Sequence, residues 1–402
     1  MSLRKMGLTS LESAPRMERQ SLFALTEGIR LKIAEFKLER TLARFQNEVE
    51  YDLSASGIYP MFIREILTPE EMEDVYNNLH LKYVHTAGTA HLREAVASFY
   101  EGMDPKSVFI TNGSAEALYL LAWSLIDPGD EVAFMLPNFM LLSHVVEANG
   151  AVVRNFNLDP ARNWSLDVDS LKAAVTPKTR LICVCNPNNP TGTVLSREQM
   201  LEVVKVAESV GAYLLSDEVY RGAEQGEEMT PSFWGLYEKV IVISGLSKSF
   251  GLPGLRVGWI AGPREIVEKA WFYHDYLSTT VTTFSDMLAT RALKPEMRAR
   301  IFRRNREIVR QNLATFTDWV NSHKGILSFT PPQAGCFAFV KFDLSVPSWD
   351  LVMDMVKNES VFVIPGSCFG IEGHLRMNFG VEKNFLARGL ERIDRTLARY
   401  HS

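Results

Sequence analysis

The sequence has few cysteines and no long apolar run. Only four cysteines occur in 402 residues, and none of them forms a CxxC pair, so we expect neither a disulfide framework nor a zinc ribbon. The first twenty residues carry charges throughout and lack the apolar region of a secretory signal. The most apolar stretches, such as residues 119–126, are far shorter than the ~18–20 residues that span a bilayer. These absences predict a cytoplasmic protein without a membrane anchor.

An excess of one charge is also lacking. The chain has 43 Lys and Arg against 48 Asp and Glu, a net charge of −5, and 46% of its residues are hydrophobic, as is typical of a globular protein. We interpret the arginine-rich stretch 298–310 as the solvated face of a long helix rather than a nucleic-acid surface. His80, His85 and His91 have poor metal-ligand spacing, and neither GxGxxG nor a P-loop is present. We therefore expect no nucleic acid, metal or dinucleotide as a partner.

Residues 107–262 alternate short apolar runs with helical patterns. Helices are predicted over 115–125 and 196–210, the second with a capping box formed by Ser196 and Gln199. Most of the apolar runs are continuous rather than alternating, which is typical of strands in a parallel sheet covered on both faces. The seven strands are expected at 107–111, 131–135, 151–156, 180–185, 213–217, 239–244 and 257–261.

The two ends of the chain differ from this middle part. Residues 1–46 have a helical pattern, and strand-like runs interleave with helical segments after residue 325. We predict a helical arm over 1–50, a large α/β domain over 51–290, and a small α+β domain over 291–402 to which the arm contributes.

Unusual residues follow several of the predicted strands. In a parallel sheet, ligands bind outside the carboxyl ends of the strands, where these loops lie. A small-residue turn at 112–116, NGSAE, precedes a helix, whose N-terminus favours a phosphate. The other loops are NPNNPTG at 186–192, SDEVY at 216–220 and SKSFGLPGLRVG at 247–258.

This ordered set of motifs closely resembles the class I/II aminotransferases among the fold-type I enzymes that use pyridoxal 5′-phosphate (PLP). The resemblance extends from about residue 51 to the C-terminus. It implies an α/β fold with a seven-stranded, mostly parallel sheet flanked by helices, together with a smaller α+β domain. It also implies PLP as the cofactor.

The resemblance assigns the residues around the cofactor ring. Lys248 would form a Schiff base with the aldehyde and then move the Cα proton as a general base. Asp217 would keep the pyridine nitrogen protonated, which makes the ring an electron sink. Tyr220 and Asn189 would face the phenolate oxygen, and the ring of Phe139 would stack on the cofactor.

The phosphate and the neighbouring subunit are assigned in the same way. Tyr83 resembles the tyrosine that relatives send across a dimer interface to the partner's phosphate, so the resemblance implies a homodimer. Arginine suits bidentate capture of an oxyanion. The implied phosphate-binding residues are Gly113, Ser114, Ala115, Ser247 and Arg256.

Substrate recognition is assigned to the C-terminal unit and to one N-terminal loop. Arg376 in HLRMNF would bind the substrate α-carboxylate and fix the Cα–H bond perpendicular to the ring. Asn189 and Gly57 are the other candidates, although the loop at 53–60 resembles the family's Gly-x-Pro loop only loosely. Gly245 is a second departure, because the family usually has Ser or Thr there as a phosphate ligand.

The predicted function is amino-group transfer from an L-amino acid to a 2-oxo acid through Lys248. An alternative is a PLP-dependent lyase, replacement or cyclising enzyme on the same scaffold, as in the capreomycidine synthase branch. A PLP-sensing DNA-binding regulator is a third class, but residues 1–46 are too few for a winged helix-turn-helix. The motifs do not identify the amino acid, because no second arginine is assigned to a distal carboxylate.

Overall fold

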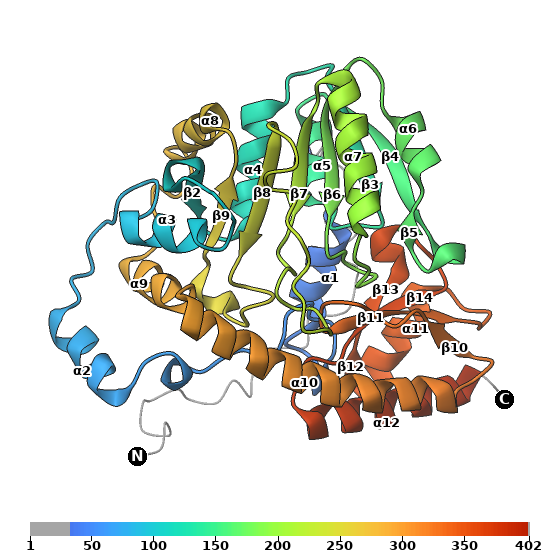
Figure 1. Cartoon of the computed structure of the whole chain (residues 1–402). Helices are drawn as coiled ribbons and strands as arrows, with labels where there is room; N and C mark the ends of the chain where they lie inside the picture. Colours follow the sequence, from blue (N-terminus) through green and yellow to red (C-terminus); the bar gives the residue numbers. More distant parts are fainter. Residues whose placement is uncertain (1–32, 401–402) are drawn as a thin grey trace, which may run out of the picture.

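The structure is a computed structural model that describes residues 33–400 (Figure 1). A large sheet with helices on both faces occupies the upper part of the view, and a smaller sheet with its own helices lies at the lower right. Most of the predicted N-terminal arm lies outside the described residues, and helix α1 (Lys37–Phe45) is the part of it that is described.

The large sheet has the strand order β2-β9-β8-β7-β6-β3-β4-β5. Pairing is parallel from β8 to β4, whereas β9 is antiparallel to both of its neighbours and β5 is antiparallel to β4. All seven predicted strands are present, and β5 is an eighth that the sequence did not indicate because two residues carry no periodicity. The strands are β2 (Val108–Thr111), β3 (Glu131–Leu136), β4 (Val152–Asp159), β5 (Ser165–Leu166), β6 (Thr179–Cys185), β7 (Tyr213–Asp217), β8 (Val240–Gly245) and β9 (Gly258–Ala261).

The continuous apolar runs are explained by helices on both faces of this sheet. Along β8, Val240 and Val242 belong to one hydrophobic cluster, and Ile241 and Ile243 belong to another on the opposite face. Successive side chains of a strand point to opposite faces, so every position of β8 is buried.

Eleven further helices follow α1 within the described residues. Helix α7 begins with the predicted capping box, in which Ser196 and Gln199 each bond the other's backbone N–H. In residues 33–400 no helix is both long and apolar enough to cross a membrane. The helices are α2 (Pro69–Asn78), α3 (Ala90–Ala97), α4 (Ser114–Leu125), α5 (Leu141–Ala148), α6 (Val168–Ala174), α7 (Arg197–Val210), α8 (Arg264–His274), α9 (Thr283–Ala292), α10 (Pro295–Ser322), α11 (Ser348–Asp354) and α12 (Lys383–Tyr400).

The smaller sheet is antiparallel and has the order β10-β11-β14-β13. The apolar run at 361–364, one of the strand-like runs after residue 325, divides between β12 and β13, because β12 pairs in parallel with β1. The strands are β1 (Tyr51–Asp52), β10 (Leu327–Phe329), β11 (Phe337–Phe342), β12 (Val361–Phe362), β13 (Ile364–Pro365) and β14 (His374–Asn378).

The sequence predicted that the basic side of α10 faces solvent, but part of this side forms ion pairs instead. Arg304 pairs with Glu65 at 3.0 Å, and Arg306 and Arg310 pair with Glu227 at 2.7 and 2.8 Å. These ion pairs attach the long helix to two loops, so this part of the prediction was wrong.

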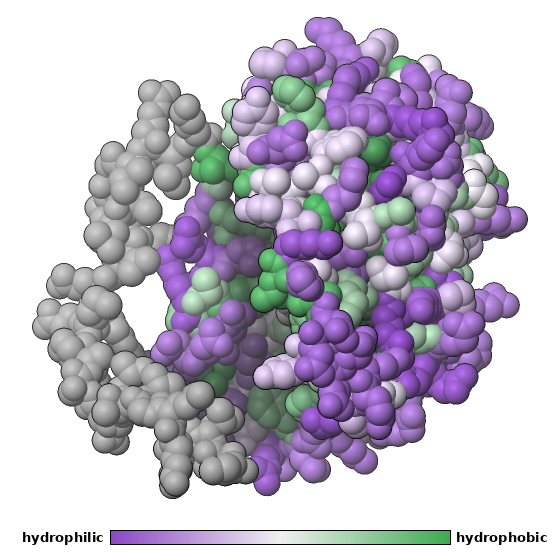
Figure 2. Space-filling view, turned by 90° about the vertical axis from the view of Figure 1, so that its left-hand side faces the viewer, coloured by the Kyte–Doolittle hydropathy of each residue, from purple (hydrophilic) through white to green (hydrophobic). Residues whose placement is uncertain are grey.

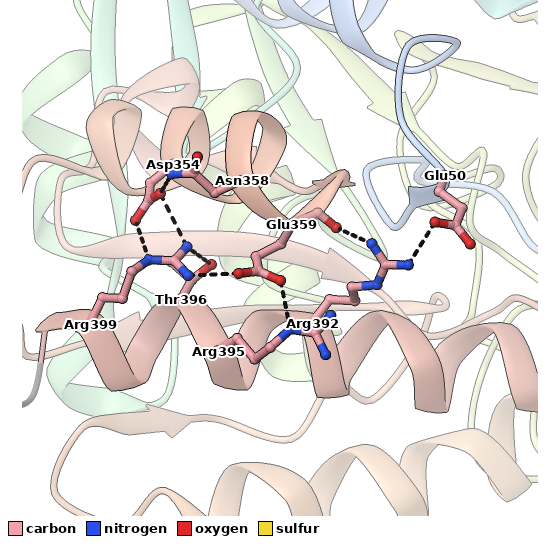
Figure 3. Close-up of polar contacts among 8 residues, drawn as sticks. All are labelled: Glu50, Asp354, Asn358, Glu359, Arg392, Arg395, Thr396 and Arg399. Atoms are coloured by element: carbon pink, nitrogen blue, oxygen red, sulfur yellow. Dashed lines mark hydrogen bonds and ion pairs between the residues drawn. The ribbon is translucent and has the colours of Figure 1, made fainter.

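Helix α12 is held by a network of arginines (Figure 3). Arg399 and Arg395 donate to the carboxylate of Glu359, which ends the π-helical turn η7 (Met355–Glu359). Arg392 donates to the Glu359 carbonyl and to Glu50. The network therefore joins the C-terminal helix to a residue just before β1.

Candidate functional site

A cleft of about 590 Å³ lies between the carboxyl edge of the large sheet and strand β14 of the small one. Two predicted site residues, Gly113 and Tyr83, are not on its wall. The others all line it: Gly57, Ser114, Ala115, Phe139, Asn189, Asp217, Tyr220, Ser247, Lys248, Arg256 and Arg376.

Lys248 lies three residues after the end of β8, where the chain turns into the cleft. Its Nζ donates to the Ser56 hydroxyl at 2.8 Å. Burial and the positive charge of Arg376 lower the pKa of Lys248 to about 8, and Asp217 opposes this shift only weakly. The uncharged, nucleophilic form of this amine is therefore far more populated near neutral pH than in an ordinary lysine, although the charged form remains the major one.

Asp217 is the last residue of β7, and its carboxylate lines the same cleft. The backbone N–H of Val219 donates to Oδ1 at 3.1 Å. Burial raises the pKa of Asp217 to about 7, and the lysine across the cleft lowers it only in part. No ion pair with a cation within 4 Å is formed among the described residues, so this partly buried carboxylate would gain from a cationic ligand.

Tyr220 and Asn189 come from the loops after β7 and β6 and meet in the cleft. Tyr220 is buried, which raises the pKa of its hydroxyl well above the ordinary value. The Asn189 side-chain oxygen accepts from Nη1 of Arg376 at 3.0 Å, which leaves its NH₂ group as a donor for a ligand. Both residues therefore offer a donor to the cleft.

Arg376 in β14 is buried with a relative exposure of 1%. Besides Asn189, it donates to the carbonyl of Ser54 at 2.7 Å, whereas its Nε has no partner among the described residues. Burial lowers the pKa of this guanidinium, and no carboxylate of the described chain pairs with it. A buried cation without an anion is costly, so a ligand carboxylate would be strongly favoured here.

An anion cradle lies at the start of α4. No side chain of the described residues caps its first turn, so the leading N–H groups at Ser114 and Ala115 face the cleft. Arg256 Nη1 donates to the Ser247 hydroxyl at 3.3 Å. Gly113 contributes by having no side chain, because a Cβ there would lie 2.5 Å from Arg256 Nη2.

The departure at Gly245 has a steric reason. A Cβ at this position would lie 2.9 Å from the carbonyl oxygen of Val257, across the antiparallel pair β8 and β9. The strand pairing therefore leaves no room for the Ser or Thr side chain that the family usually has there.

The sequence did not indicate one wall of the cleft, which is built by α1 and by the residues directly before and after it. Phe36 packs edge-on against Phe139, with ring centroids 4.8 Å apart. Ser56, which bonds Lys248, was also missed, because a serine in an irregular loop carries no signal of its partner. The residues of this wall are Phe36, Leu38, Glu39, Leu42 and Gln46.

Tyr83 lies between α2 and α3, outside its own chain's cleft. It is 85% exposed, and its neighbours Tyr76 and Leu81 are 86% and 87% exposed. Figure 2 views the molecule from the α2 side, where apolar side chains (green) lie among polar ones beside a hollow. The reach of Tyr83 into a neighbouring subunit stays a prediction.

Comparison with known proteins identifies the family. The family model described as aminotransferase class I and II matches residues 63–393. The chain belongs to this family. The predicted aminotransferase fold and enzyme class are thus confirmed, and the family and fold imply PLP as the cofactor.

Individual relatives span most of the chain. The crystal structure of a PLP-dependent aminotransferase from Streptococcus suis superposes with a TM-score of 0.87 at 31% identity, covering 92% of this chain and all of that one. Aromatic-amino-acid aminotransferase 2 of Thermococcus litoralis is 30% identical, over 78% of this chain and 84% of that protein. Capreomycidine synthase of Streptomyces vinaceus is 29% identical, over 90% of this chain and 93% of that protein.

Proposed function

We propose that this aminotransferase holds PLP in the cleft and exchanges an amino group between an L-amino acid and a 2-oxo acid. One observation carries the proposal: a lysine, a carboxylate and an arginine share a single cleft, and none of them has an ion-pair partner among the described residues. Lys248, Asp217 and Arg376 thus match an aldehyde, a ring nitrogen and a carboxylate respectively.

The residues of the cleft fit PLP. When bound, PLP supplies an aldehyde carbon that joins amines and a protonated ring that withdraws electrons from the substrate Cα. Lys248 would hold the aldehyde carbon and Asp217 the ring nitrogen, with Asn189 and Tyr220 at the ring hydroxyl. The anion cradle fits the phosphate, through Ser114, Ala115, Ser247 and Arg256, and Phe139 would lie against the ring.

The chain's own residues then orient the substrate and move its proton. Arg376 binds the α-carboxylate and so fixes the direction of the Cα–H bond, with Asn189 and Gly57 beside it. Lys248, once released by the incoming amine, accepts the Cα proton, for which its lowered pKa suits it. The same residues act in reverse on a 2-oxo acid.

A homodimer and a cytoplasmic setting belong to the same proposal. The exposed aromatic and apolar side chains around α2 support a partner surface that Tyr83 would cross. The four cysteines are all buried and free, which agrees with a reducing compartment.

The test is the half-reaction of the PLP-loaded protein with single L-amino acids, followed by absorbance and by 2-oxo acid release. We expect Lys248→Ala to lose turnover by at least about a thousandfold, because the amine is both the attachment point and the base. Lys172→Ala, an exposed lysine of α6, is the matched control. Full transaminase activity in Lys248→Ala would refute the proposal.

A second candidate is an elimination, replacement or cyclisation reaction on the same scaffold. The relationship to capreomycidine synthase over 90% of this chain favours it, as does the irregular loop at 53–60. Product analysis in the same assay separates the two functions. A 2-oxo acid indicates transamination, whereas ammonia, a leaving group or a cyclised amino acid indicates the alternative.

A further inference from the structure

One charged side chain of the cleft has no part in the proposed function. The charged residues that line the cleft are Glu39, Asp217, Lys248, Arg256 and Arg376. The last four are assigned to the cofactor and to the substrate α-carboxylate. Of the charged residues that the structure describes in the cleft, Glu39 alone is unassigned, and it comes from α1, the element whose position the sequence did not predict.

Within the part of the chain that the structure describes, Glu39 is available to a ligand. Its side chain is exposed within the cleft, and it forms no hydrogen bond or ion pair with any described residue. Burial is the main cause that lowers the pKa of both Lys248 and Arg376, and the Glu39 carboxylate opposes it in both cases. The negative charge of Glu39 therefore interacts electrostatically with Lys248 and Arg376, the residues that face the substrate.

The surroundings of Glu39 restrict what it can bind. Phe36, Leu38 and Leu42 come from the same segment, and Leu118 and Phe139 add apolar surface from the large sheet's side. Figure 1 shows α1 (blue) between the large sheet and the C-terminal unit, and it contacts β13 and the turn η8 (Gly366–Phe369). The wall thus combines apolar surface for a methylene chain with one negative charge.

Anionic side chains are disfavoured by the same geometry. Among residues 33–400, no lysine or arginine lines the cleft apart from the three already assigned, so a distal carboxylate would meet Glu39 without a cation from this part of the chain. A like charge close by costs free energy, whereas an ammonium or guanidinium group would give a charge-assisted hydrogen bond.

We infer that the amino donor carries a cationic side chain, with its α-carboxylate on Arg376 and its distal ammonium or guanidinium group on Glu39. This inference rests on the proposed function. It makes Glu39 a residue that determines specificity, contributed by the N-terminal segment.

The first experiment compares matched amino acids on the PLP-loaded enzyme. L-Lysine, L-norleucine and L-2-aminoadipate have similar chain lengths but a positive, neutral or negative end. We expect kcat/KM to decrease in that order. Glu39→Gln should reduce the ratio of kcat/KM for L-lysine to kcat/KM for L-norleucine by about 10- to 100-fold. This is the usual contribution of a hydrogen bond between charged groups. Glu48→Gln, an exposed residue just after α1, is the control and should keep the ratio.

A binding measurement gives a readout independent of turnover. Neither 5-guanidinopentanoate nor hexanoate has an α-amine, so neither can react with the cofactor. Both therefore probe only the carboxylate end of the site at Arg376 and the distal end at Glu39. Calorimetry on the loaded enzyme should give tighter binding for the guanidino acid, and Glu39→Lys should reverse the preference.

The outcomes separate the two proposals. Turnover of L-norleucine or L-2-aminoadipate in preference to L-lysine would overturn the inference alone, as would an unchanged ratio in Glu39→Gln. Absence of a half-reaction with every amino acid class would overturn the proposed function, and the inference with it.

Discussion

Lys248 and Asp217 have pKa values that are shifted toward each other, to about 8 and about 7. In each case burial is the main cause, because it disfavours the charged form of either group. The cleft therefore keeps an amine and a carboxyl group that both titrate near neutral pH. Perturbed groups that share a cleft are typical of catalytic sites, and here they coincide with the residues of the motifs.

Asp217 should make the cofactor-free protein less stable as the pH rises. Its folded pKa of about 7 lies above the ordinary value of 3.8. Its contribution to stability is thus complete below about pH 4 and is lost as the pH rises through 7, by up to about 1.4 kcal/mol per pH unit. We expect Asp217→Asn to lose less stability than the wild type between about pH 5 and 7. Urea unfolding at both pH values is the measurement.

Asp318→Asn, at an exposed site of α10, is the control for this experiment. If the stability of Asp217→Asn kept the full wild-type pH dependence in that interval, the raised pKa of Asp217 would not be the cause of the pH dependence.

The sequence predicted the site residues that belong to recognisable family motifs and failed for those that reach the cleft through packing of distant segments. Asn189, Asp217 and Lys248 belong to contiguous motifs at or just after the carboxyl ends of parallel strands, and the family resemblance of these motifs implied their roles. Glu39 and Ser56 reach the cleft only because α1 and the loop at 53–60 fold over it. No local pattern contains this information, since it depends on contacts between distant segments.

At the scale of elements, burial on both faces made the strands easy to predict. Runs such as 239–244 are apolar throughout, because helices cover both sides of the sheet. Failures occurred where pairing depends on a distant partner. The run at 361–364 divides because β12 pairs with β1 and β13 pairs with β14. The arginines of α10 likewise find acidic partners in loops that the helical pattern does not reveal.

Glu359 is expected to stabilise the packing of α12 on η7. It is 7% exposed and accepts from Arg395 at 2.7 Å and Arg399 at 2.6 Å (Figure 3). Burial alone would raise the pKa of this carboxyl, but the two arginines outweigh it and lower the pKa. We expect Glu359→Gln to lower the free energy of unfolding by about 1–3 kcal/mol near neutral pH. Chemical denaturation measures this change.

The pH dependence of that loss gives a further check. Because the folded pKa is lowered, the contribution of Glu359 is present above its ordinary pKa of 4.5 and is lost as the pH falls below it. The wild type and Glu359→Gln should therefore converge in acid. Glu391→Gln, exposed on the same helix, is the control. A constant difference at all pH values would contradict the ion-pair explanation.

At the scale of the molecule, the two ends of the described chain meet. Strand β1 pairs with β12, and Arg392 of α12 bonds Glu50 just before β1. The N-terminal segment is thereby anchored to the C-terminal unit, which places α1 over the cleft. The segment around α2 instead extends outward, with Tyr76, Leu81 and Tyr83 in solvent. An exposed apolar surface of this kind is typical of a subunit interface.

A cross-subunit role for Tyr83 can be tested by complementation. If Tyr83 serves the neighbour's site, Tyr83→Ala and Lys248→Ala homodimers are each impaired, the first in cofactor affinity and the second in turnover. Mixed subunits would assemble one complete site per heterodimer, with Lys248 from one chain and Tyr83 from the other. Random exchange should restore about a quarter of the wild-type activity at limiting cofactor, because half of the dimers are mixed and each has one intact site. The control variant is Tyr119→Ala, because Tyr119 lies in α4 outside the cleft wall. Mixing Tyr119→Ala with Lys248→Ala subunits should give no activity beyond that expected from the two homodimers and the diluted wild-type-like sites. Heterodimers verified by differential tags that recover no activity would place Tyr83 outside the neighbouring site.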